Sequence, residues 1–84
     1  MTKISVVGLG KLGACMAACF AHKGFSVIGV DVNPRTVQFV NEGRPPVFEP
    51  GLAEMMAEVR KRLWATGDYK EVIYKTDVTS LIQR

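Results

Sequence analysis

The segment from Lys3 to Asp31 constrains the fold of this chain more than any other part. An apolar run at residues 4–7 leads into the glycine-rich turn at residues 8–13, where a helical pattern begins. A second apolar run at residues 25–30 then ends at Asp31. This order of strand, glycine turn, helix, strand and acid predicts one unit of a doubly wound parallel α/β sheet that binds a dinucleotide.

Each of the three glycines in the turn has its own expected physical role. Gly8 permits the sharp turn out of the strand. A side chain at Gly10 would keep the backbone away from a pyrophosphate, and one at Gly13 would hold the helix away from the strand. The first amide groups of the helix have no intrahelical acceptors, so they form an anion site for the phosphates. A glycine turn in an α/β protein that binds another ligand is the alternative interpretation.

Asp31 ends the second strand, where its carboxylate would accept hydrogen bonds from the adenosine ribose hydroxyls. It would also repel the additional phosphate of NADP, so we expect NAD as the cofactor. Arg35 and Thr36 follow closely enough to meet the adenosine end, although a solvent-exposed arginine in a first helical turn explains Arg35 equally well. The expected cofactor-binding residues are Gly8, Leu9, Gly10, Lys11, Leu12, Gly13, Asp31, Arg35 and Thr36.

Length and composition limit the other classes of function. A chain of 84 residues is one domain at most, and its core is marginal on its own. The net charge of +3 is mild and no aromatic residues interleave with the basic ones, so we expect no nucleic-acid partner. The longest uncharged helical stretch, residues 12–21, is too short to cross a bilayer, and the N-terminus shows no signal-peptide pattern. We therefore expect no membrane partner and a cytoplasmic location.

The first predicted helix carries both cysteines and the only histidine. Cys15 and Cys19 are four residues apart, a spacing that suits packing against the sheet and is poor geometry for a disulfide or a zinc site. His22 lies in the last helical turn, away from the phosphate end, and Gly24 ends the helix. We expect His22 to be a helix-end residue, so the chain offers no catalytic residue and no metal ligand.

A second helix should follow Asp31. Asn33 is a good N-cap and Pro34 a good first helical residue, and the helix should run to about Glu42 and end at Gly43. A stiff, proline-rich connection occupies residues 43–52. A plain crossover between two strands does not need such a loop, so we expect it to pack over the sheet edge or to form part of a site.

The remaining sequence predicts one further helix at residues 52–63 and a short third strand at residues 63–66. Asp68 can cap a helical segment that runs through Tyr74, and residues 77–82 resemble the beginning of a fourth strand. A doubly wound sheet requires more strands than these. We therefore interpret residues 1–84 as the N-terminal part of a Rossmann-like dinucleotide-binding domain.

These residues resemble the N-terminal end of the UDP-glucose/GDP-mannose dehydrogenase family, whose NAD-dependent members oxidise the C6 alcohol of a nucleotide sugar to a carboxylate. The resemblance covers essentially the whole chain and is carried by residues 3–10, 27–34, 46–52 and 65–69. The glycine turn is shared by many oxidoreductases. The sequence Glu49-Pro50-Gly51-Leu52 is much more particular to this family.

The resemblance implies cofactor contacts from residues 8–13 and from Asp31. It also implies a homo-oligomer, a nucleotide-sugar substrate held by domains outside this chain, and a catalytic thiol, lysine and asparagine further along. Two departures from the family pattern concern the cofactor site. Lys11-Leu12 replaces an aromatic or aliphatic pair and puts a charge near the pyrophosphate, and the usual basic residue two after the proline is Thr36 here, with Arg35 one position earlier.

The leading hypothesis is therefore the NAD-binding part of a nucleotide-sugar 6-dehydrogenase, inactive by itself. Another Rossmann dehydrogenase, of the 3-hydroxyacyl-CoA or 6-phosphogluconate type, is an alternative against which residues 49–52 count. A non-catalytic dinucleotide-sensing module is a third hypothesis, because it would carry the same glycine turn.

Overall fold

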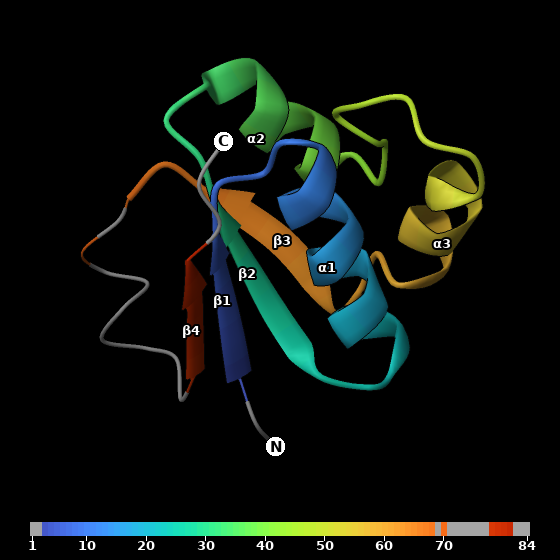
Figure 1. The fold of residues 1–84 in the computed structure, drawn as a ribbon, viewed down its shortest axis with the longest axis horizontal. Helices are drawn as coiled ribbons and strands as arrows, with labels where there is room; N and C mark the ends of the chain where they lie inside the picture. The colour runs from blue at the N-terminus through green and yellow to red at the C-terminus, as the bar shows by residue number, and fades with distance from the viewer. Residues whose placement is uncertain (1–2, 69, 71–77, 82–84) are drawn as a thin grey trace.

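The computed structural model describes residues 3–68, 70 and 78–81, which form a parallel sheet with helices packed on it (Figure 1). The strands lie in the order β3-β2-β1-β4. Their bounds are Lys3–Val7 (β1), Ser26–Val30 (β2), Leu63–Thr66 (β3) and Val78–Leu81 (β4). The helices are Lys11–His22 (α1), Pro34–Asn41 (α2) and Leu52–Glu58 (α3).

Every strand pair in this sheet is parallel. In the register, Lys3 lies opposite Ser26 across β1 and β2, and Ile4 lies opposite Val78 across β1 and β4. Val27 lies opposite Leu63 across β2 and β3. The predicted parallel α/β class is therefore confirmed, with β1 at the centre and the first crossover running through α1.

The predicted ends of the first two helices are confirmed. Gly24 follows α1 with φ +106° and donates its N–H to the carbonyl of Ala21 at 3.0 Å. The Asn33 side chain caps α2 by accepting the Arg35 N–H at 2.9 Å, and Gly43 follows with φ +75°. The third strand also has the predicted bounds. The helical segment predicted from Asp68 to Tyr74 lies largely outside the described residues.

The predicted helix over residues 52–63 is too long, because α3 ends at Glu58. Arg62 explains the difference. Its carbonyl accepts the Val27 N–H at 2.7 Å, and its side-chain Nε donates to the Ala21 carbonyl at 2.8 Å. These bonds align the chain with β2 just before β3 begins, so the segment from Val59 to Arg62 forms turns and does not continue the helix.

Small residues allow α1 to lie close to the sheet. The buried side of this helix consists of Gly13, Ala14, Ala17, Ala18 and Ala21. The prediction that both cysteines pack against the sheet is wrong for Cys19, which is exposed. Cys15 is half-buried and packs against the core cluster, and both cysteines line the side of α1 next to α3. Short side chains occupy the sheet-facing side because a larger one there would push the helix away.

Both faces of the central strands are buried. Val6, Val27, Met56 and Leu63 belong to the core on the α1 side, whereas Ile28 and Val30 belong to a second cluster on the other face. Burial on both faces is typical of parallel sheets. No helix within the described ranges has the length and apolar character needed to cross a membrane.

Candidate cofactor-binding turn

The glycine turn connects β1 to α1 and brings the start of the helix into close contact with the end of the strand. The Gly8 N–H donates to the Val30 carbonyl at 2.8 Å, and Gly8 itself has φ +90°. A Cβ atom placed on Gly13 would lie 1.8 Å from the Gly8 carbonyl oxygen. The predicted role of Gly13, close contact between helix and strand, is confirmed.

The N-terminus of α1 has no capping side chain. Gly10 occupies the N-cap position, and the first turn of the helix carries no acidic residue. In contrast, the Asn33 side chain caps α2, which also begins at the carboxyl ends of the parallel strands. The first amide groups of α1 lack intrahelical acceptors and carry the positive end of the helix dipole, so this terminus favours an anionic ligand.

Asp31 lies directly after β2, as predicted, and joins the turn to the next segment. It is 3% exposed. Its Oδ2 accepts the Leu9 N–H at 2.8 Å, and its Oδ1 accepts the Asn33 N–H at 2.9 Å. The sequence did not predict these bonds, which hold the glycine turn and the start of α2 in a fixed relation.

The other predicted contact residues differ in how they are placed. The Leu9 side chain is buried and fills the space above Gly29, so only its backbone is at the turn. Leu12 is 62% exposed at the start of α1. Arg35 is exposed and Thr36 half-buried in the first turn of α2. Their contacts with the adenosine end stay predictions.

Lys11 connects the turn to the proline-rich loop. Its Nζ lies 3.3 Å from Oε2 of Glu49, with the Lys11 side chain 73% exposed and the Glu49 side chain 33% exposed. The sequence predicted a positive charge at Lys11, near the pyrophosphate, but did not indicate that Glu49 would pair with it. The loop therefore contacts the turn through a direct ion pair, and its part in a site stays a prediction.

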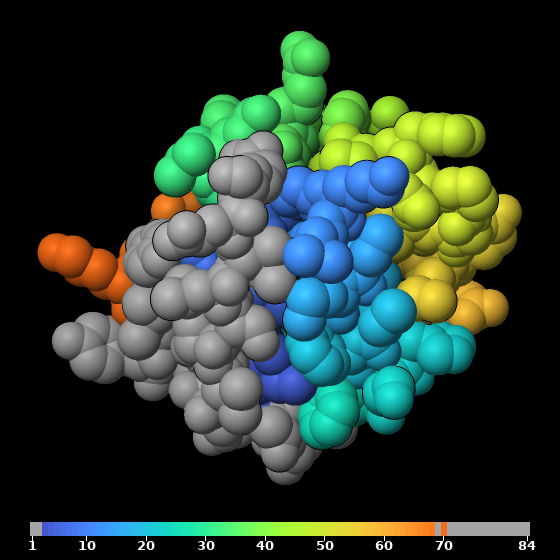
Figure 2. Space-filling view, viewed as in Figure 1, coloured from blue at the N-terminus to red at the C-terminus, as the bar shows by residue number. Residues whose placement is uncertain are grey.

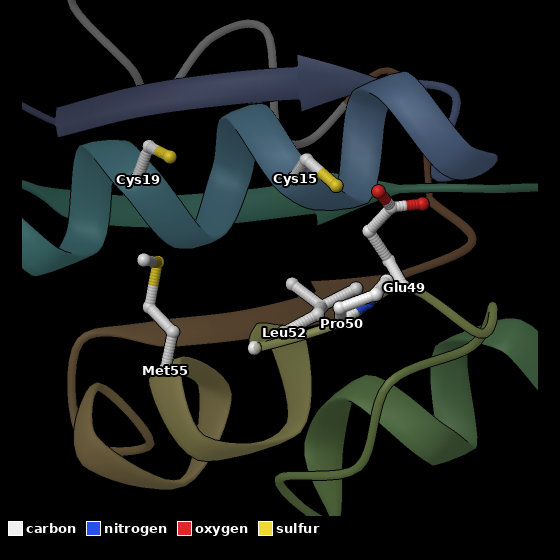
Figure 3. A pocket seen from close by; sticks show the side chains of 7 residues that line it. Cys15, Cys19, Glu49, Pro50, Leu52 and Met55 are labelled. Atoms are coloured by element: carbon white, nitrogen blue, oxygen red, sulfur yellow. The ribbon is translucent and has the colours of Figure 1, made fainter.

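The loop and α3 form an open pocket of about 230 Å³ against the side of α1, with Glu49 at one end (Figure 3). Figure 2 shows that α1 and the segment that leads through the loop into α3 share one face of the molecule. The residues that line the pocket are Cys15, Cys19, Glu49, Pro50, Gly51, Leu52 and Met55.

The chemistry of this pocket does not favour a nucleophile. Burial raises the pKa of the Cys15 thiol, the Glu49 carboxylate and the neighbouring Cys19 raise it further, and Lys11 partly offsets them. A raised pKa keeps the thiol protonated and therefore unreactive.

His22 lies at the opposite end of α1, where its Nδ1 is 3.7 Å from Oε2 of Glu58. Among the described residues, no group of three or more His, Cys, Asp or Glu side chains could hold a metal ion.

Comparison with known proteins agrees with the geometry of the turn. The family model for the UDP-glucose/GDP-mannose dehydrogenase family, NAD binding domain, matches residues 2–82. GDP-mannose 6-dehydrogenase from Pseudomonas aeruginosa is 39% identical over 79 residues, which are 92% of this chain and 18% of that protein. UDP-glucose 6-dehydrogenase from Haloferax volcanii is 42% identical over 80 residues, which are 94% of this chain and 18% of that protein.

Solved structures give the same result. A ternary complex of GDP-mannose dehydrogenase from Pseudomonas aeruginosa superposes with a TM-score of 0.92 at 37% identity, over 96% of this chain and 19% of that one. A UDP-glucose dehydrogenase from Pyrobaculum islandicum gives 0.90 at 38% identity, over the same shares. The chain thus spans about a fifth of the length of these relatives. It belongs to the UDP-glucose/GDP-mannose dehydrogenase family and matches that family's NAD binding domain.

Proposed function

We propose that this chain binds NAD through the turn at residues 8–13 and Asp31, as the cofactor-binding part of a nucleotide-sugar 6-dehydrogenase. The observation that carries the proposal is the junction at Leu9. Its N–H is held by the Asp31 carboxylate, which joins the uncapped N-terminus of α1 to the end of β2. The pyrophosphate would lie on the first amides of α1, and the adenosine ribose would lie at Asp31.

The side chains near this junction would have different tasks. Gly10 and Gly13 leave room for the pyrophosphate and for close packing, Lys11 supplies a positive charge and Leu12 a backbone amide. The Leu9 N–H is already donated to Asp31, so Leu9 would hold the shape of the turn. Arg35 and Thr36 would meet the adenosine end from the first turn of α2. The nicotinamide end would extend over the crevice between β1 and β4, where the order of the strands reverses.

The names of two relatives support a proposal for the substrate class. They are a GDP-mannose 6-dehydrogenase and a UDP-glucose 6-dehydrogenase. We infer a nucleotide sugar whose C6 alcohol is oxidised to the carboxylate, with one hydride passed to NAD in each of two steps. The groups that hold the sugar and form the covalent intermediate would come from segments outside this chain. A homo-oligomer is part of the same proposal.

Calorimetric titration of the chain with NAD tests the proposal. The wild-type chain is expected to bind, and Gly10→Val is expected to lose most of the binding because its side chain would hold the pyrophosphate off the backbone. Thermal unfolding of Gly10→Val verifies that the variant is folded. Absence of NAD binding by the wild-type chain, or undiminished binding by folded Gly10→Val, would contradict the proposed site.

A further inference from the structure

The ion pair between Lys11 and Glu49 connects two functional parts of the molecule. Lys11 is the first residue of α1, at the terminus that favours an anion. Glu49 stands just before α3, where its carbonyl accepts the Leu52 N–H at 3.1 Å. Its side chain points away from its own loop toward α1 (Figure 3). The backbone of Glu49 is therefore anchored by α3 while its carboxylate lies beside the turn.

Two anions would compete for Lys11. The described structure pairs its ammonium with Glu49 at 3.3 Å. A pyrophosphate on the first amides of α1 would bring negative charge to the same terminus and would attract the same ammonium. The Lys11 side chain is 73% exposed, and an exposed ion pair contributes little free energy. Lys11 can therefore turn from one anion to the other at small cost.

We propose that Glu49 is a positioning residue of the cofactor site, which lowers the affinity for NAD by competing with the pyrophosphate for Lys11. The inference rests on the proposed function, since it requires that the phosphates bind at this terminus. It assigns a role to the glutamate of the proline-rich loop. NAD binding would then break the ion pair between Lys11 and Glu49, the only one that Glu49 forms among the described residues. The loop would lose this contact with the turn when the cofactor binds.

A double-mutant cycle on the chain tests this role, with NAD affinity measured by calorimetry. Glu49→Gln is expected to tighten binding about 2- to 5-fold, and Lys11→Met to weaken it by a similar factor, as expected for an exposed charge pair. In the Lys11→Met background, Glu49→Gln should leave the affinity unchanged, because no ammonium remains to compete for. Glu58→Gln is the matched control, since Glu58 pairs with His22 at the far end of α1, and it should bind like wild type.

A phosphate-free ligand separates this role from a merely structural one. Adenosine, followed by NMR titration, should bind equally to wild type and Glu49→Gln, whereas ADP should show the same tightening as NAD. Equal NAD affinity in all variants, or weaker binding by Glu49→Gln, would overturn the role of Glu49 and leave the proposed function standing. If the wild-type chain binds neither NAD nor ADP, the proposed function fails and this inference fails with it.

Discussion

Gly13 is the residue whose replacement the geometry opposes most strongly. A Cβ atom there would lie 1.8 Å from the Gly8 carbonyl oxygen and 2.9 Å from its carbon, both of which are backbone atoms. Gly13→Ala is expected to lower the free energy of unfolding by about 1–3 kcal/mol, the typical cost of overpacking. Urea denaturation measures the change.

Gly67→Ala is the matched control. Among the described residues, a Cβ at Gly67 would meet only the Asp31 carbonyl oxygen, at 3.6 Å, which is an ordinary contact. This variant should unfold within about 0.5 kcal/mol of wild type, as most substitutions without a specific defect do. Equal losses in the two variants would show that the turn and α1 are not packed as described.

Asp31 should make the chain prefer NAD to NADP. Its carboxylate lies where the adenosine ribose is expected and would oppose a 2′-phosphate, a difference of about 1–3 kcal/mol. The wild-type chain is the right sample, because Asp31 also accepts two backbone N–H groups and its replacement would disturb the turn. Titration with both cofactors decides: equal affinity, or tighter NADP binding through Arg35, would contradict the assignment.

For single residues, a place in the fold was predictable where the neighbouring sequence determines it. The close packing at Gly13, the position of Asp31 after β2 and the cap at Asn33 all follow from their positions relative to the adjacent strands and helices. The pair of Lys11 with Glu49 was not predictable, because it depends on how the proline-rich loop folds back on α1. The burial of Cys19 was predicted wrongly, since the helical period gives the spacing of the residues on one face but not which face meets the sheet.

Among the elements, α2 is hydrogen-bonded to the sheet through the Asn41 side chain, beside the buried Val40. Asn41 donates from Nδ2 to the Ala65 carbonyl at 3.0 Å and accepts the Ala65 N–H on Oδ1 at 2.7 Å. This amide pairs with the outer strand β3 as a neighbouring strand would. Asn41→Ala removes both bonds and leaves two backbone groups unpaired in a partly buried place, so it should cost about 1–3 kcal/mol of unfolding free energy.

The control for Asn41 lies on the same helix. Gln38 donates to Glu42 at 3.1 Å on the exposed side of α2. Its replacement by Ala should change the unfolding free energy by no more than about 0.5 kcal/mol, as for other exposed pairs four residues apart. If urea denaturation gives the same loss for both variants, α2 is not held to β3 through Asn41.

The boundaries of the elements show where local signals are sufficient. The caps of α2 and the glycine after α1 could be predicted because they act through neighbouring residues. The end of α3 could not, because Arg62 contacts Ala21 and Val27 in distant segments. Apolar residues continue at helical spacing beyond Glu58, but pairing with β2 determines the conformation there.

For the molecule as a whole, we predict that the 84-residue chain turns over no substrate. It carries the turn and Asp31, but the raised pKa of Cys15 disfavours a thiolate and His22 lies at the far end of α1. It also spans about a fifth of its relatives. NADH absorbance with UDP-glucose, GDP-mannose or UDP-N-acetylhexosamines should stay at background. Sustained NADH formation would mean that a complete active site lies within these residues.

The central claim is that the cofactor binds across the turn and the end of β2, and amide NMR of the isotope-labelled chain tests it most directly. On titration with NAD, the largest shifts are expected in residues 8–13 and 31–36, with residues of α3 shifting less. An absence of shifts, or shifts centred on α3 with the glycine turn unchanged, would contradict the account.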